Sequence, residues 1–246
     1  MSNTAIIIPS RMKAERLPGK PMKLIGGKEM ILHVYDSAKN SKVGNVLVVT
    51  PDKEIDKLIK KNGGNSFLSL KDHETGTDRV FEGYKNFYTS KPEFIINLQG
   101  DMPNLDSQDI INLNEYIKKN FCDMATLASS IKNKEEIENK NIVKVITRDN
   151  IEKSAFSKAL DFKRDLIDLK NKFVYHHIGI YAFTSKALMR YVNLKRSRLE
   201  TERSLEQMRL LENKMNIHVG FTQSNPLSID TQSDLDEIKK QMEKNE

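Results

Sequence analysis

Short apolar runs of strand length alternate with segments of helical period along most of this chain. The apolar runs lie at residues 5–8, 46–50, 94–98, 124–128, 143–147, 178–183 and 217–221. Between them, apolar residues recur on one helical face at residues 30–38, 55–59, 80–84 and 110–117. This alternation predicts a three-layer α/β fold, in which helices cover both faces of a mostly parallel sheet. Asp52 and Ser107 are the predicted N-caps of two of these helices.

The alternation loosens after about residue 150. Residues 163–172 are rich in charge and predict an exposed excursion, and long excursions in compact domains often cover sites. Apolar spacing then marks two more helices, one by Leu199, Leu205, Met208 and Leu211 and the last by Leu235, Ile238 and Met242. A chain of 246 residues is long enough to bury a sizeable core. We therefore expect one domain over residues 1–246, with a distinct subregion at about residues 150–212.

Composition narrows the possible partners. The net charge is +6, but 40 Lys and Arg are mixed with 34 Asp and Glu along the whole length. No basic stripe with interleaved aromatic residues is present, so we expect no nucleic-acid partner. The single Cys122 excludes an internal disulfide and suits a reducing cytosol. No signal peptide or run of membrane-spanning length is evident, so no membrane partner is expected either.

A loop rich in cations, PSRMKAERLPGKP at residues 9–21, follows the first apolar run. A loop after a parallel strand opens at the carboxyl edge of the sheet, where ligands bind. Arg11, Arg16 and Lys20 can converge there on one polyanion, because Arg offers a planar fork of donors and Lys a mobile point charge. Gly19 lets the backbone approach closely. The segment predicts a triphosphate-binding loop, and the alternative is a solvated basic loop.

Two acids follow in similar positions. Asp101, in NLQGDMP at residues 97–103, comes directly after an apolar run and is expected at the same sheet edge. Asp230, in IDTQSDL at residues 229–235, precedes the last helix. Mg²⁺ usually takes one or two protein carboxylates and fills its shell with phosphate oxygens and water, so this pair predicts a Mg²⁺ site. The alternatives are a turn acid at Asp101 and a helix cap at Asp230.

Two further segments carry polar residues in suggestive patterns. Residues 72–79 read DHETGTDR, which without further information is the start of a helix followed by a surface cation, Arg79. Strand alternation in residues 175–181, YHHIGIY, puts His177 and Tyr181 on one face. That pair suits either a pocket or a hydrogen-bonded core. Two adjacent histidines do not face one metal, so no zinc site is expected.

Together these motifs resemble the CMP-Kdo synthetase (3-deoxy-manno-octulosonate cytidylyltransferase) family, and they occur in the family's order from residue 5 to 237. The matching segments are RLPGKP, HETGTDR, QGDMP, NIVKV, FSKA, HHIGIYAF, LEQMR and IDTQSDL. The resemblance implies a nucleotide-diphospho-sugar transferase-like, Rossmann-like fold with a small sugar-binding and dimerisation excursion. It also implies transfer of CMP from CTP to 3-deoxy-D-manno-octulosonate (Kdo) for lipopolysaccharide synthesis, Mg²⁺ dependence, a homodimer and a cytoplasmic location.

The same resemblance assigns roles to single residues. Catalysis would rest on Arg11, Lys20, Asp101 and Asp230, with the metal on Asp101 and Asp230. CTP would contact Ser10, Arg11, Arg16, Lys20, Gly76, Thr77 and Arg79. Kdo would contact Gln99, Lys158, His177, Tyr181, Glu206 and Gln207.

The chain departs from the family pattern at a few positions. Lys158 stands where the family has Arg, and Lys cannot copy the two parallel hydrogen bonds of Arg to a carboxylate. Ser10, Met102 and Arg203 replace the usual Ala, Glu and acid. Two alternatives therefore stay open: a cytidylyltransferase for another 2-keto acid sugar, such as amino-Kdo or a sialic acid, or a non-catalytic nucleotide-sensing protein of the same fold.

Overall fold

The computed structural model describes residues 3–165 and 173–243. The chain divides into two compact units. The first unit comprises Met1–Asn112 and Pro226–Glu246, and the second comprises Leu113–Asn225. The subregion predicted at residues 150–212 lies inside the second unit.

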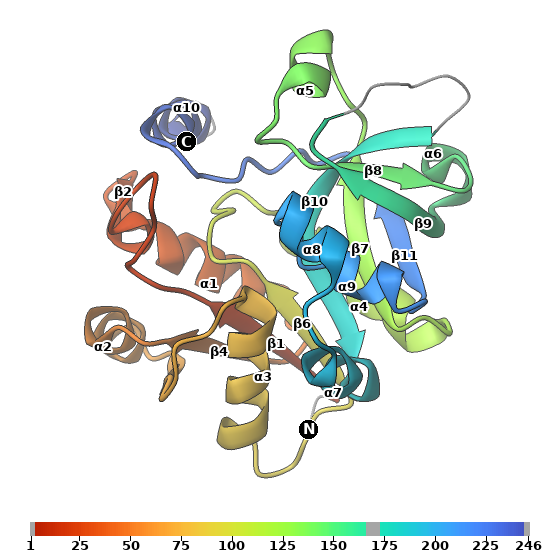
Figure 1. Cartoon of the computed structure of the whole chain (residues 1–246). Helices are drawn as coiled ribbons and strands as arrows, with labels where there is room; N and C mark the ends of the chain where they lie inside the picture. The colour runs from red at the N-terminus through yellow and green to blue at the C-terminus, as the bar shows by residue number, and fades with distance from the viewer. Residues whose placement is uncertain (1–2, 166–172, 244–246) are drawn as a thin grey trace. The chain divides into compact units, whose positions relative to one another are not determined.

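A parallel sheet forms the centre of the first unit (Figure 1). Its strands are ordered β5-β4-β1-β6, and every neighbouring pair is parallel. Their bounds are Thr4–Pro9 for β1, Asn45–Thr50 for β4, Asn65–Leu68 for β5 and Phe94–Leu98 for β6. Each residue of β1 is buried, as expected of a central strand that is covered on both faces.

Helices and one short hairpin complete the first unit. The helices are α1 (Met30–Asn40), α2 (Lys53–Lys61), α3 (Gly76–Phe87) and α10 (Gln232–Glu243), together with a 3-10 turn, η1, at Lys20–Met22. Strands β2 (Leu24–Ile25) and β3 (Lys28–Glu29) form the hairpin. Figure 1 shows α10, in blue, beside β2, in red, although they are far apart in sequence. They share a hydrophobic cluster of Leu17, Ile25, Met30, Ile229, Leu235 and Ile238.

Strands of the second unit pair in the order β10-β7-β11-β9-β8, and β8 also pairs with β10. The set therefore closes on itself, which protects its edges. Its strands are β7 (Met124–Ser129), β8 (Lys144–Thr147), β9 (Phe156–Lys163), β10 (Phe173–Thr184) and β11 (Ile217–Phe221). Only β7 and β11 run parallel among these pairs, so the predicted parallel arrangement holds in the first unit and not in the second.

Short helices surround these strands. They are α5 (Lys134–Glu138), α6 (Ile151–Ser154), α7 (Ser185–Asn193), α8 (Arg198–Arg203) and α9 (Met208–Glu212), while α4 (Ser107–Lys119) crosses from the first unit into the second. The single helix expected over residues 199–211 is two helices, because α8 ends at Ser204 in the left-handed conformation with φ 53°.

The two residues predicted as N-caps, Asp52 and Ser107, have other roles in the structure. Asp52 does precede α2, but its carboxylate accepts the backbone N–H of Met12 at 2.7 Å instead of capping the helix. Ser107 is the first residue of α4, and the carboxylate of Asp106 accepts the N–H of Gln108 at 2.8 Å.

The charged stretch at 163–172 is described only in part. Lys163 ends β9, and residues 166–172 lie outside the described part of the chain. Within residues 3–165 and 173–243, no helix combines the length and the hydropathy needed to cross a membrane.

Candidate active site

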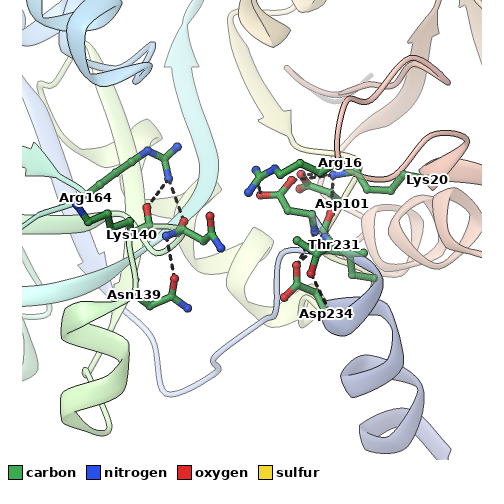
Figure 2. A network of polar contacts seen from close by, with 11 residues as sticks. Arg16, Lys20, Asp101, Asn139, Lys140, Arg164, Thr231 and Asp234 are labelled. Carbon is green, nitrogen blue, oxygen red and sulfur yellow. Dashed lines mark hydrogen bonds and ion pairs between the residues drawn. The ribbon is translucent and has the colours of Figure 1, made fainter.

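A cluster of opposite charges gathers three distant segments of the first unit (Figure 2). The Nζ atom of Lys20 lies 3.1 Å from Asp101 Oδ2 and 3.3 Å from Asp230 Oδ1. It also donates to the carbonyl oxygen of Ile229 at 2.5 Å. Arg16 Nη2 forms a 2.9 Å ion pair with the other carboxylate oxygen of Asp230. The structure therefore brings together four residues that the sequence predicted to meet: Arg16, Lys20, Asp101 and Asp230.

Lys20 and Asp101 form the less exposed part of this cluster. The side chain of Lys20 is 14% exposed and that of Asp101 is 25% exposed. Burial acts to lower the pKa of Lys20, but the carboxylates of Asp101 and Asp230 outweigh it and raise that pKa above its ordinary value. Lys20 is therefore a permanent cation held between two carboxylates.

The loop that carries Lys20 is fixed by its own backbone. Gly19 has φ 70°, a left-handed conformation that glycine adopts without strain. Its N–H donates to the carbonyl of Met12 at 3.0 Å, and the carboxylate of Asp52 holds the N–H of Met12. Leu17 is buried in the cluster beneath α10 and anchors the loop between its two cations, Arg16 and Lys20. The local sequence thus turns both cations toward the acids.

Two buried polar side chains of this unit, Ser10 and Arg79, have atoms without a hydrogen-bond partner among the described residues. These atoms are Ser10 Oγ and the Nε and Nη2 atoms of Arg79. Arg79 is only 3% exposed, so the interpretation of a surface cation is wrong. Burial, followed by the nearby charge of Arg11, lowers its pKa. A buried guanidinium with unused donors is costly unless an acceptor or anion meets it.

A chain of side-chain hydrogen bonds joins α3 to the end of β6. Gly76 begins α3, so the expectation of a helix start at Gly76 and Thr77 is confirmed. Asn97 Nδ2 donates to Thr77 Oγ1 at 2.9 Å, and Gln99 Nε2 donates to Asn97 Oδ1 at 3.0 Å. A Cβ atom at Gly76 would lie 3.2 Å from Gln99 Oε1. Gly76, Thr77 and Gln99 therefore lie together at the carboxyl edge of the sheet.

Within the second unit, His177 and Tyr181 lie close together on β10, with ring centroids 5.6 Å apart. His177 Nε2 is 3.0 Å from the hydroxyl of Thr126, which itself donates to the carbonyl of Ile180 at 2.7 Å. Because that hydroxyl is the donor to Ile180, His177 must donate from Nε2. Burial, with a smaller contribution from His176, lowers the pKa of His177 to about 3, so the ring is neutral.

The connection between α8 and α9 carries Glu206 and Gln207. Gln207 is 2% exposed, and its Nε2 has no hydrogen-bond partner among the described residues. A buried ion pair holds the two helices, with Arg209 Nη2 2.5 Å from Glu200 Oε1 and Arg209 Nε 2.8 Å from Glu200 Oε2. Arg203, which departs from the family's acid, pairs with Asp161 at 2.5 Å.

Lys158 lies apart from the other residues assigned to the sugar. It is in register with His218, so these two side chains share one face of the β9–β11 pair. Its neighbour Ser157 points to the opposite face. Ser157 pairs with Val219 of β11, and Val219 pairs with Thr126 of β7, so Ser157 and Thr126 share a face. His177 lies on that face too, because it is hydrogen-bonded to Thr126. Lys158 and His177 thus occupy opposite faces of the strands in this unit, although the sequence grouped both with the sugar contacts.

A second polar network lies in the second unit, and Figure 2 shows the part of it around Arg164. The buried Lys144 donates to the carbonyls of Asn139 at 2.6 Å and Arg164 at 2.9 Å. Arg164 Nη1 donates in turn to the carbonyls of Lys140 at 3.1 Å and Asn141 at 3.0 Å. Burial lowers the pKa of Lys144. These bonds clasp the segment before β8 to the segment after β9.

The donor set of the first unit suits a hard cation shared with phosphate. Among the described residues, no group of three or more His, Cys, Asp and Glu side chains is placed to hold a metal ion. Asp101 and Asp230 nevertheless converge on one ammonium, so both carboxylates already face one cation. Two carboxylates are what Mg²⁺ commonly takes from a protein when phosphate oxygens and water supply the rest.

Comparison with known proteins agrees with this arrangement. The fold is the α/β fold of the nucleotide-diphospho-sugar transferases: a solved structure of CMP:2-keto-3-deoxy-manno-octonic acid synthetase complexed with CTP matches with a TM-score of 0.88 and 32% identity, covering 100% of both chains.

Sequence comparison then defines the family. The cytidylyltransferase family matches residues 5–217. The 3-deoxy-manno-octulosonate cytidylyltransferase of Rhodopseudomonas palustris (strain BisB5) is 40% identical over 237 residues, covering 95% of each chain. That of Bartonella tribocorum is 36% identical over 236 residues, covering 96% of each. The chain therefore belongs to the cytidylyltransferase family and, within it, to the 3-deoxy-manno-octulosonate cytidylyltransferases.

Sequence reasoning missed several residues that shape the site. Asn97 and Thr126 sit inside apolar strands, where a polar residue gives no sign of its partner. Asp234 accepts hydrogen bonds from the backbone around Asp230. A signal for Asp234 was present, because Thr231 and Asp234 have the spacing of a capping box directly before an apolar helix face.

Proposed function

We propose that this chain transfers CMP from CTP to Kdo, giving CMP-Kdo and pyrophosphate for lipopolysaccharide synthesis. Relatives of nearly the same length, at 36% and 40% identity, carry this activity in their names, and the matching solved structure is a complex with CTP. The observation in this chain that carries the proposal is the convergence of Arg16 and Lys20 with Asp101 and Asp230. That convergence pairs a polyanion-binding loop with a cation-binding pair of acids.

The reaction needs positioning and charge stabilisation more than covalent chemistry. The anomeric hydroxyl of Kdo attacks the α-phosphorus of CTP in line, and its proton leaves to solvent. The new oxygen–phosphorus bond forms while the bond to the β-phosphate breaks, and its electrons leave with pyrophosphate. Arg11, Arg16 and Lys20 hold the β- and γ-phosphates and stabilise the charge that builds up on the leaving group.

Mg²⁺ is the proposed cofactor, held by Asp101 and Asp230. When bound, it would neutralise phosphate charge and lower the pKa of the attacking hydroxyl. Both acids already face a cation, which supports this assignment. The alternative roles of a turn acid and a helix cap do not account for their convergence.

The remaining contacts are proposed by the same resemblance. Ser10, Gly76, Thr77 and Arg79 bind the nucleotide, and the unused donors of Arg79 support an anionic or acceptor-rich ligand there. Gln99, His177, Tyr181, Glu206 and Gln207 bind Kdo, and the unused Nε2 of Gln207 supports a ligand with acceptor groups. Lys158 was assigned with them, but its position on the opposite face from His177 argues against a shared contact. We further propose a cytoplasmic homodimer.

Pyrophosphate release in the presence of CTP tests the activity. The panel of acceptors is Kdo, amino-Kdo and a sialic acid, each with CTP and Mg²⁺. We expect release with Kdo well above the others. Preference for another keto-sugar would replace Kdo as the substrate, and no release with any of them would favour a nucleotide-sensing protein.

The metal assignment has its own test. Chelation should abolish activity, and Asp101→Asn and Asp230→Asn should each nearly do so, because asparagine keeps the size of the side chain and loses its charge. Restoring Mg²⁺ should recover only the parent. A variant with full activity at ordinary Mg²⁺ would reduce that aspartate to a turn or cap residue.

A further inference from the structure

A hydrogen-bonded turn at the start of α10 fixes the backbone that carries Asp230 (Figure 2). The N–H groups of Asp230 and Thr231 both donate to Asp234 Oδ2, at 3.0 Å and 2.8 Å. In return, the N–H of Asp234 donates to Thr231 Oγ1 at 3.3 Å. The exchange is reciprocal, as in a capping box, and so fixes the N–H groups of Asp230, Thr231 and Asp234 in one turn.

The residue before Asp230 is fixed from the other side. The N–H of Ile229 donates to the carbonyl of Asp101 at 2.9 Å, and its own carbonyl accepts from Lys20. Ile229 is fully buried in the cluster that also contains Leu17 and Leu235. Packing and hydrogen bonds therefore set the main chain up to residue 229, and Asp234 sets it from residue 230 onward.

Asp234 takes no part in the charge cluster itself. Among the described residues, its side chain accepts hydrogen bonds from the backbone of Asp230 and Thr231 and forms no ion pair. Asp230, one residue beyond the buried Ile229, meets Arg16 and Lys20. The side chain of Asp230 can point at those cations only while its backbone keeps the turn that Asp234 closes.

We propose that Asp234 is a positioning residue that aims the carboxylate of Asp230 at the cation site. This inference rests on the proposed function, since Asp230 is assigned there as a ligand of Mg²⁺. Asp234 acts as a hydrogen-bond acceptor for two amides, and its negative charge is not what the site requires.

Two substitutions separate the acceptor from the charge. Asn keeps one oxygen that can accept both N–H groups, so Asp234→Asn should retain kcat and the Mg²⁺ requirement within about threefold of the parent. Asp234→Ala removes the acceptor, and should lower kcat and raise the Mg²⁺ concentration for half-maximal rate by about tenfold or more. The KM for CTP should change much less, because the cationic loop is untouched.

Binding of Mn²⁺ in the presence of a non-hydrolysable CTP analogue, followed by electron paramagnetic resonance, gives a readout that does not depend on turnover. Asp234→Ala should weaken Mn²⁺ binding, and Asp234→Asn should not. Asp236→Ala is the matched control, because Asp236 lies exposed on the same helix and its carboxylate accepts from the side chain of Gln232. It should behave as the parent.

Several outcomes would overturn the proposal. Equal losses in Asp234→Asn and Asp234→Ala would mean that the charge matters, and parent-like values in Asp234→Ala would mean that the turn holds without it. A lowered thermal midpoint with unchanged kcat and Mn²⁺ affinity of the folded protein would mean a purely structural role. If the parent made no CMP-Kdo, the proposed function would fail, while the Mn²⁺ measurement would still test the positioning of Asp230.

Discussion

The ammonium of Lys20 lies between two carboxylates that would repel each other strongly if it were absent. A divalent cation that binds Asp101 and Asp230 must therefore share them with Lys20 or release it. Release would free a cation for the phosphates of CTP at the moment when a metal takes over the acids. Lys20 can thus pair with Asp101 and Asp230 in the free protein and bind the phosphates of CTP in the complex.

Removing this ammonium should have opposite effects on two measurements. Lys20→Ala should raise the CTP requirement and lower turnover, at a cost of about 2 to 4 kcal/mol in transition-state stabilisation. Without nucleotide, the same variant should bind Mn²⁺ more tightly than the parent, because no ammonium competes for the carboxylates. Steady-state kinetics and Mn²⁺ titration measure the two effects.

Lys13→Ala is the control for this experiment, since Lys13 lies exposed in the same loop and its loss changes the net charge equally. It should leave both measurements near those of the parent. Normal kinetics in Lys20→Ala would show that Lys20 does not bind the phosphates of CTP. Unchanged or weaker Mn²⁺ binding would show that the ammonium does not compete with the metal.

At the scale of elements, strand β9 separates residues that the sequence groups together. Ser157 shares its face with Thr126 and His177, and Lys158 faces the other way beside His218. Charge from Lys158 also contributes, after burial, to the lowered pKa of His218. A lysine in this position lies on the wrong face for a sugar that contacts His177 and Tyr181.

Because Lys158 and His177 lie on opposite faces, substitutions at Lys158 and Gln207 should differ in their effect on the KM for Kdo. Lys158→Ala should leave the KM for Kdo within about twofold of the parent at saturating CTP, because a side chain outside the pocket removes no binding energy. Gln207→Ala should raise that KM by roughly tenfold, since it deletes a buried donor. A clear rise in the KM for Kdo in Lys158→Ala, without one in Gln207→Ala, would show that Lys158 binds the carboxylate of the keto acid.

The elements that the sequence predicted share one property, a continuous apolar run or a clear helical face. β6 and β11 begin and end where their apolar runs predict, and α10 follows its helical spacing. Strand β9 was not predicted, because it contains the charged residues Lys158, Asp161 and Lys163 and its sequence resembles that of an exposed loop. Pairing with β11 on one side and β8 on the other keeps this segment in the sheet.

The convergence of three charged residues could be predicted from their positions at the ends of elements. Lys20, Asp101 and Asp230 each lie at the end or start of an element, so a parallel sheet brings them to one edge. The burial of Arg79 and the facing of Lys158 depend on neighbours distant in sequence. No local pattern encodes such neighbours, so these features had to come from the structure.

At the scale of the whole molecule, three histidines link stability to pH: His177, which is buried, and His176 and His218, which are partly buried. Burial lowers the pKa values of His176, His177 and His218, that of His177 from 6.5 to about 3. In the pH range between those two values, the unfolded chain binds a proton that the folded protein excludes at His177. Stability should therefore be complete above about pH 6.5 and fall progressively as the pH drops toward 3.

This linkage predicts a smaller pH dependence when one of the histidines is removed. The thermal midpoint of the parent should fall between about pH 7 and pH 5, and that of His177→Asn should fall less over the same range. The comparison uses the slope with pH, so a general destabilisation of the variant does not affect it. Equal slopes would show that His177 is protonated in the folded protein.

The proposed homodimer is a property of the whole molecule that single substitutions can test. Leu160 lies at the irregularity in β9, where it has no pairing partner in β8, and is 54% exposed. Phe173, at the start of β10, is 42% exposed. Both lie in the predicted dimerisation subregion at residues 150–212. A second copy of the chain is the occupant that would bury such apolar side chains, and a charge placed there would be stranded in the interface.

Leu160→Asp should therefore shift the protein from twice the chain mass of 28.3 kDa toward that mass itself, as measured by light scattering after size exclusion. Phe121→Asp is the matched control, because Phe121 is fully exposed and lies outside the subregion. It should leave the dimer intact, since the substituted side chain stays in water. A parent that elutes at 28.3 kDa at micromolar concentration, or a dimer that only Phe121→Asp disrupts, would exclude dimerisation through this surface.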